Sequence, residues 1–170
     1  MKKGTTIGIG LVIACAALAA MLAPASDGSA QVLRIGGASA NFGLHSLIGG
    51  FLPDPAQYNV VSGGNIDASG LGLAPNCRGY VTAQPDVIVR YENPASFLRF
   101  FVRAPGDTTL VINDGAGHWW CSDDEGGSLN PMIDMTRPAR GQYDVWIGSY
   151  RSGETIRGTL YVTELSGNRP

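Results

Sequence analysis

Short runs of alternating hydrophobic and polar residues dominate the chain from about residue 57 onward. In residues 96–103, Leu98, Phe100 and Val102 share one face of an extended strand, and two arginines share the other. Such alternation is typical of antiparallel strands with one buried face. The pattern predicts strands at residues 57–62, 79–83, 86–91, 96–103, 108–112, 118–122, 132–136, 142–148 and 159–164.

Turn-forming residues separate these predicted strands. Clusters of glycine, asparagine, aspartate and proline, such as residues 62–65, 104–107 and 113–115, interrupt the alternation at intervals typical of β-hairpins. No convincing helix is predicted, so the pattern indicates an all-β sandwich or barrel. We expect one such domain at residues 51–170. Residues 31–50 are less regular, and an edge strand, an irregular N-terminal arm and a linker are all compatible with them.

The first 30 residues differ from the rest. Lys2 and Lys3 precede a long uncharged apolar run, and small residues follow at positions 28–30. This order predicts a secretory signal peptide over residues 1–30. Cleavage near Ala25, a lipoprotein signal centred on Cys15 and a retained anchor are the alternatives. We therefore expect a protein that is secreted, at the cell surface or periplasmic, with no membrane span after signal removal.

Charge argues against one class of partner. Removal of residues 1–30 leaves ten arginines and no lysine against thirteen acidic residues, a net charge of −3. The arginines form no basic run. Because nucleic acids bind mainly through clusters of basic side chains that neutralise phosphates, no nucleic-acid partner is expected.

Two cysteines remain once the signal peptide is removed. They are Cys77 and Cys121. In an exported chain an isolated pair of cysteines is most simply a disulfide. The sequence therefore predicts one disulfide, which would attach the segment around Cys77 to the predicted strand 118–122.

An acidic stretch carries the strongest candidate chemistry. Asp123 and Asp124 directly follow the predicted strand 118–122, and Asp107 directly precedes the predicted strand 108–112. A hairpin of these two strands would bring the three carboxylates to its open end. Like charges opposite one another destabilise a sheet, and a bound cation would remove that repulsion.

The register of this hairpin decides which acids meet. Pairing of Ile112 with His118 would place Asp107 opposite Asp123, and a slip of one residue would bring a neighbour of Asp123 there instead. Calcium suits such a site because it binds about six to eight oxygens in adaptable geometry, and Asn130 would add an amide oxygen. Zinc and copper fit less well because clustered histidines are missing from the sequence. An ordinary solvated acidic turn is the alternative.

The same stretch also has a superficial likeness to a peptidase loop. Residues 124–128 read Asp-Glu-Gly-Gly-Ser, but a glutamate stands where the Gly-Asp-Ser-Gly-Gly loop of chymotrypsin-like enzymes has its nucleophile. Ser128 and His118 are the remaining candidates for a catalytic pair. No catalytic triad is supported, so we assign no catalytic residue and expect a protein that is not an enzyme.

Three tryptophans are candidates for a ligand surface. Trp119 and Trp120 are neighbours in one predicted strand, so their side chains point to opposite faces. Trp146 lies in the predicted strand 142–148, on the face opposite the core set that begins with Tyr143. An exposed tryptophan near Trp146 is a candidate for binding a ligand or partner, but packing beneath a loop is the favoured interpretation.

Three segments of the chain carry a shared pattern, namely residues 107–112, 121–127 and 138–150. Together they resemble the bacterial pre-peptidase C-terminal domain. The resemblance covers about residues 96–164. It implies an antiparallel jelly-roll-like β-sandwich without catalytic residues, related in architecture to calcium-binding collagen-binding domains. The whole chain after the signal is also similar to short stand-alone secreted bacterial proteins. Residues 51–55 and 77–80 add to this second resemblance.

These observations predict a secreted, non-catalytic, calcium-stabilised β-sandwich that acts in extracellular binding, adhesion or self-assembly. The expected partner is an extracellular protein, a polysaccharide or a second copy of the chain. Two alternatives remain. One is a small secreted hydrolase of the serine-peptidase type, and the other is an accessory or inhibitory partner of a separate secreted peptidase.

Overall fold

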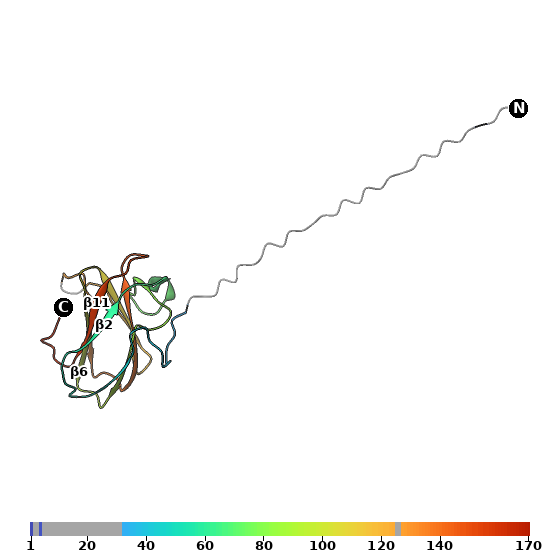
Figure 1. Cartoon of the computed structure of the whole chain (residues 1–170). Helices are drawn as coiled ribbons and strands as arrows, with labels where there is room; N and C mark the ends of the chain where they lie inside the picture. The colour runs from blue at the N-terminus through green and yellow to red at the C-terminus, as the bar shows by residue number, and fades with distance from the viewer. Residues whose placement is uncertain (2–3, 5–31, 125–126) are drawn as a thin grey trace.

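Strands account for most of the regular structure in the computed structural model, which describes residues 1, 4, 32–124 and 127–170 (Figure 1). The predicted signal peptide at residues 1–30 lies outside the described residues apart from Met1 and Gly4, and Glu125 and Gly126 lie outside them too. Within the described ranges, no helix has both the length and the apolar character needed to cross a membrane.

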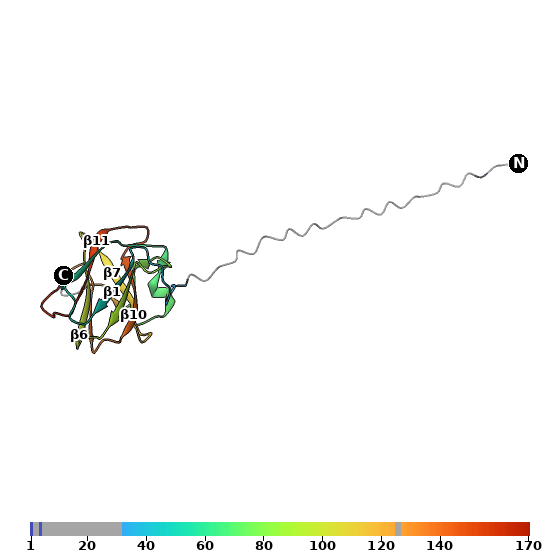
Figure 2. The same cartoon turned by 60° about the horizontal axis from the view of Figure 1, so that its bottom comes forward.

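A seven-stranded sheet, sheet A, forms one layer of a sandwich, with β10 at its centre. Strands β5, β7 and β4 pair with β10, and β1, β8 and β3 extend the sheet outward from these three. The pairs are antiparallel except β1 with β5, which is parallel. Figure 2 labels β1, β7 and β10 of this sheet. Its strands are β1 (Leu44–Ile48), β3 (Ile66–Asp67), β4 (Tyr80–Val81), β5 (Val87–Glu92), β7 (Thr108–Asn113), β8 (Trp119–Ser122) and β10 (Gly141–Ser149).

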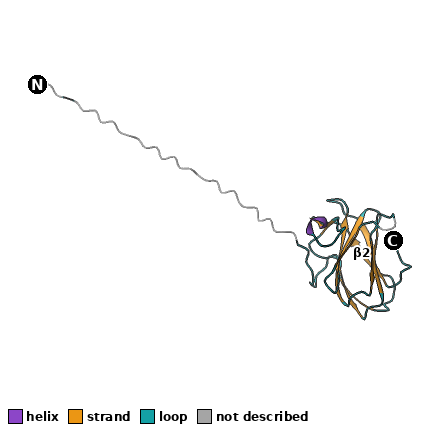
Figure 3. Cartoon of the chain, turned by 180° about the vertical axis from the view of Figure 1, so that it is seen from behind, coloured by secondary structure: helices purple, strands orange, loops and turns teal. Residues whose placement is uncertain are grey.

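A four-stranded antiparallel sheet, sheet B, forms the second layer, in the order β2-β11-β6-β9. One short 3₁₀ helix, η1 (Ala68–Leu71), is the helical element of the described part of the chain (Figure 3). The nine predicted strands are all present within one or two residues, and the all-β, single-domain sandwich is confirmed. The strands of sheet B are β2 (Ala56–Val61), β6 (Phe97–Arg103), β9 (Met132–Thr136) and β11 (Arg157–Thr163).

The main core lies between the two sheets and follows the period-two pattern. On β6, Leu98, Phe100 and Val102 are fully buried and face sheet A. On β10, Tyr143 belongs to the inward set, as predicted. Burial of each such side chain contributes about 1.5–3 kcal/mol relative to leaving it exposed. This core therefore fixes which face of each strand points inward.

A second, smaller core covers the outer face of sheet A. Trp146 and Val111 point away from the main core, yet both are fully buried beneath Leu33, Ile66 and Ala68. The prediction that Trp146 contributes to a ligand surface is therefore wrong. The physical reason is that residues 33–83 contain the short elements that pack over this face, and strand periodicity gives no sign of such a cover.

The β7–β8 register differs by two residues from the predicted one. Ile112 pairs with Trp120 instead of His118. The cause is Asp114, whose side-chain Oδ1 accepts hydrogen bonds from the backbone N–H groups of Ala116 and His118, each at 2.9 Å. This cap closes a three-residue loop that ends at Gly117, whose φ of +84° suits glycine.

Residues 31–50, left open by the sequence, contain an edge strand preceded by an arm. Strand β1 pairs with β5, and the arm before it crosses the outside of sheet A. Backbone N–H groups of Arg34 and Asn41 donate to Ala83 and Pro85, and Gly36 N–H donates to the Asp144 carboxylate at 2.7 Å. The described part of this segment thus belongs to the folded domain.

Asp86 fastens the arm to the centre of the sheet. Its carboxylate accepts hydrogen bonds from the Asn41 side chain and from Ile147 N–H, both at 2.8 Å. Asp86 is nearly fully buried, and this burial raises the pKa of its carboxyl to about 7, although the two hydrogen bonds act to lower it. Burial, and not a neighbouring charge, therefore accounts for the raised pKa of Asp86.

We expect the raised pKa of Asp86 to make the protein less stable as the pH rises from about 4 to about 7. The folded state holds this proton more tightly than the unfolded state, so the contribution is complete below the unfolded pKa and is lost through the folded pKa. The slope for one proton is at most about 1.4 kcal/mol per pH unit. Urea unfolding of the wild type and Asp86→Asn in chelator should give profiles that diverge across this window. Parallel profiles would contradict the assignment.

Candidate metal centre

Three carboxylates meet where the β7–β8 hairpin opens. Asp107 directly precedes β7, and Asp123 and Asp124 directly follow β8. One oxygen from each side chain lies within 4.8 Å of the others. The predicted acids therefore come together despite the shifted register, because both strand ends lie at the same mouth of the hairpin.

The spacing of these oxygens suits a calcium ion. Two oxygens that each lie about 2.3–2.6 Å from the same calcium are at most about 5 Å apart, and the 4.8 Å span lies within this limit. The spacing is thus compatible with a calcium ion, whose shell backbone carbonyls or waters would complete.

Three buried oxygens in this region have no hydrogen-bond donor among the described residues. Asp107 Oδ1, Asp123 Oδ1 and Glu154 Oε2 are buried, and no group in the described ranges donates a hydrogen bond to them. Glu154 lies in the turn between β10 and β11 and acts electrostatically on Asp107. A buried carboxylate oxygen without a donor is costly, and a bound cation would satisfy it.

Two arginines lie close to the cluster and balance part of its charge. Arg78 Nη1 lies 3.5 Å from Asp123 Oδ2, and its side chain is 46% exposed. Arg151 acts electrostatically on Asp107. Sequence reasoning missed these arginines and Glu154, because tertiary contacts bring them to the site. The one available signal was that Arg78 follows Cys77, the predicted disulfide partner of Cys121.

The pKa values of Asp107 and Asp123 are both shifted upward in the folded protein. Burial raises the pKa of Asp123, and the charges of Asp124 and Asp107 raise it further, while Arg78 lowers it. Burial likewise raises the pKa of Asp107, and Asp124 adds to that rise. These directions show that the carboxylates repel one another in the ionised state, as predicted.

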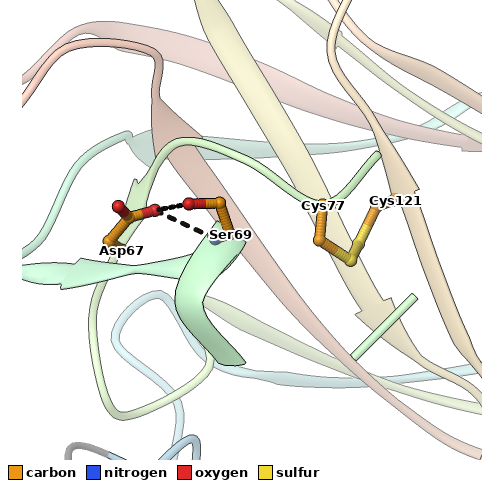
Figure 4. Close-up of a disulfide and its surroundings, with 4 residues drawn as sticks. All are labelled: Asp67, Ser69, Cys77 and Cys121. Carbon is orange, nitrogen blue, oxygen red and sulfur yellow. Dashed lines mark hydrogen bonds between the residues drawn. A yellow bond between two sulfur atoms is a disulfide. The ribbon is translucent and has the colours of Figure 1, made fainter. Parts of the chain in front are cut away.

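A disulfide borders the site (Figure 4). Cys77 and Cys121 are bonded across a sequence separation of 44 residues, with their Cα atoms 5.0 Å apart, so the predicted pair is confirmed. Cys121 lies on β8 two residues before Asp123, and Cys77 directly precedes Arg78. The bond therefore holds the arginine and the acids on facing segments.

Asn130, the fourth predicted ligand, uses its side-chain amide in hydrogen bonds within the protein. Its Oδ1 accepts from Ala104 N–H at 3.0 Å and from the Thr108 hydroxyl at 3.2 Å, and its Nδ2 donates to the Ala104 carbonyl. The side chain thus ties the entry to β9 to the β6–β7 turn. Direct ligation by Asn130 would require these bonds to break.

The residues considered for peptidase chemistry do not meet. Ser128 neighbours Leu129, whose carbonyl accepts from Thr108 N–H at the start of β7, whereas His118 pairs with Asp114 beyond the end of that strand. Five residue steps along an extended strand span roughly 17 Å. Ser128 and His118 therefore lie near opposite ends of β7 and do not form a nucleophile–base pair.

The remaining two tryptophans differ in exposure. Trp119 is partly buried, and its ring lies 5.7 Å from that of Trp146 in the second core. Trp120 is 36% exposed, and its indole Nε1 donates to Asp114 at 2.8 Å. Trp120 is thus the tryptophan that presents a ring to solvent, held in place by the hairpin cap.

Comparison with known proteins adds no relative. No protein-family model matches the chain, and no curated protein matches it in sequence. The resemblance to the pre-peptidase C-terminal domain therefore rests on the sequence motifs alone.

Proposed function

We propose that this protein is an exported, non-catalytic β-sandwich that binds calcium at Asp107, Asp123 and Asp124 and acts in extracellular binding, adhesion or self-association. The observation that carries the proposal is the convergence of three carboxylates, two of which, Asp107 and Asp123, have a buried oxygen with no donor in the described ranges. Calcium would supply positive charge there and fix the end of β8 relative to β7. We assign the calcium ion a structural role, because Ser128 and His118, the residues considered for catalysis, lie near opposite ends of β7.

Further features support an extracellular role. The disulfide is of the kind that persists in oxidising compartments, which agrees with the signal peptide proposed from the sequence. We also propose that the chain is related to the pre-peptidase C-terminal domain, on the basis of the sequence motifs. The partner would be an extracellular protein, a polysaccharide or a second copy of the chain.

Calcium should raise the melting temperature of the wild-type protein, and chelator should lower it. A ligand that binds only the folded state stabilises by about 2.7 kcal/mol when its free concentration is a hundred times its dissociation constant. Differential scanning calorimetry in millimolar calcium, millimolar magnesium and chelator would measure this effect. Magnesium should give the smaller shift, because it requires a tighter shell of ligands.

Asp123→Asn should abolish most of the calcium-dependent shift while leaving the metal-free protein about as stable as the wild type. The substitution removes repulsion from Asp107 and Asp124, and it also weakens the partly exposed ion pair with Arg78, which is worth on the order of 1 kcal/mol. Asp67→Asn is the matched control, since Asp67 caps η1 through an oxygen that asparagine retains. Identical melting curves of the wild type in calcium and in chelator would refute the calcium proposal.

A further inference from the structure

The last residues of the chain are held against the outer face of sheet B by two arginines of β6. Arg99 Nη1 donates to the carbonyls of Ser166 and Asn168, at 2.7 and 2.6 Å. Arg103 Nη2 donates to the carbonyl of Arg169 at 2.5 Å. Figures 1 and 2 both show the C-terminus beside the labelled strands β6 and β11. Residues 165–170 are called the C-terminal segment below.

The arginines that hold this segment are themselves fixed by the sheet. Arg99 is 4% exposed and forms a two-pronged pair with Asp134 of β9, at 2.5 and 2.7 Å. The Arg103 guanidinium lies over the rings of Phe101 and Tyr161, at 5.6 and 5.3 Å from their centres. Cation–π contacts and a bidentate carboxylate both restrict a guanidinium, so the donors are oriented before the segment binds.

One side chain of the segment adds selectivity. Asn168 Nδ2 donates to the Thr163 hydroxyl at 2.8 Å and to Asp54 Oδ1 at 3.5 Å. The arginine bonds reach main-chain carbonyls, which every peptide carries, whereas this amide bond requires an asparagine or a similar donor. The segment is therefore held both through its main chain and through the side chain of Asn168.

We propose that the outer face of sheet B is a peptide-docking site, which the C-terminal segment fills within its own molecule and which the same segment of a second copy enters in its place. The contacts described are non-covalent, so an identical segment makes them equally well from another chain. The segment directly follows β11, and the backbone N–H groups of Glu164 and Leu165 are hydrogen-bonded to Asp54 and Thr163. Within the molecule it therefore competes at an effective concentration of about millimolar or higher. Exchange between copies is therefore expected only at high protein concentration. This inference goes beyond the calcium site and does not depend on it.

A labelled peptide with the sequence of residues 165–170 tests the site on the full-length chain. Asn168→Ala in the protein weakens the internal competitor, so the peptide should bind this variant about three- to tenfold more tightly than the wild type, the effect of one or two hydrogen bonds. The same substitution in the peptide should weaken binding by a similar factor. Fluorescence anisotropy in chelator measures both changes.

Two further measurements distinguish specific peptide binding from a non-specific destabilisation of the protein by Asn168→Ala. Arg103→Gln, added to the Asn168→Ala protein, removes a donor and should lower peptide affinity. In light scattering, the wild type should gain mass towards millimolar concentration, and excess free peptide should reverse this gain. Equal peptide affinity for the wild type and Asn168→Ala, no binding at millimolar peptide, or a mass that stays monomeric would overturn the proposal.

Discussion

Replacing Cys77 and Cys121 together by serine should lower the free energy of unfolding by about 4 kcal/mol. The disulfide closes a loop of 44 residues, and the restriction of the unfolded chain by a loop of this length gives roughly that stabilisation. Urea unfolding in chelator, with the wild type beside the double variant, would measure the difference. A loss of this size is a large fraction of the total stability of a domain of this length.

Reductant provides the matched control. It should destabilise the wild type by about the same amount and leave the double variant unchanged, because the variant has no disulfide to reduce. Intact mass with and without reductant would confirm that the wild type loses one bond. A double variant as stable as the oxidised wild type would show that the bond contributes little to folding.

Trp146→Ala should lower the free energy of unfolding by about 3–5 kcal/mol, the range for truncation of large buried aromatic residues. Trp146 is fully buried at the centre of β10 and packs against Trp119 in the second core. Truncation leaves a cavity between sheet A and the segments that cover it. Trp146→Phe should cost much less, since most of the apolar volume remains, and the Trp146 Nε1 has no hydrogen-bond partner in the described ranges.

Trp120→Ala is the contrasting variant. The Trp120 side chain is partly exposed and donates one hydrogen bond to Asp114. Its truncation should therefore lower the free energy of unfolding by only about 1 kcal/mol. Chemical denaturation of the three variants would rank them. Equal losses for Trp146→Ala and Trp120→Ala would contradict the assignment of Trp146 to a core and of Trp120 to the surface.

The candidate site was only partly predictable from the sequence. A local hairpin brings some of its residues together, whereas contacts between remote segments bring the others. Asp107, Asp123 and Asp124 flank two strands joined by a short turn, so a local hairpin is enough to bring them together. Arg78 and Glu154 reach the site through the disulfide and through the β10–β11 turn, which are contacts between remote segments. Sequence spacing contains no information about such contacts.

The alternation of apolar and polar residues by itself determined the strands, the all-β class and the inward set of the main core, since each depends on a period of two along the chain. The cysteine count likewise determined the disulfide. Only the tertiary structure decided that Trp146 is buried, because the cover over sheet A comes from residues 33–83. It also decided the hairpin register, which the Asp114 side chain sets by capping the turn. Apolar burial within a strand is periodic and can be read locally, whereas side-chain caps and packing between remote segments depend on the folded chain.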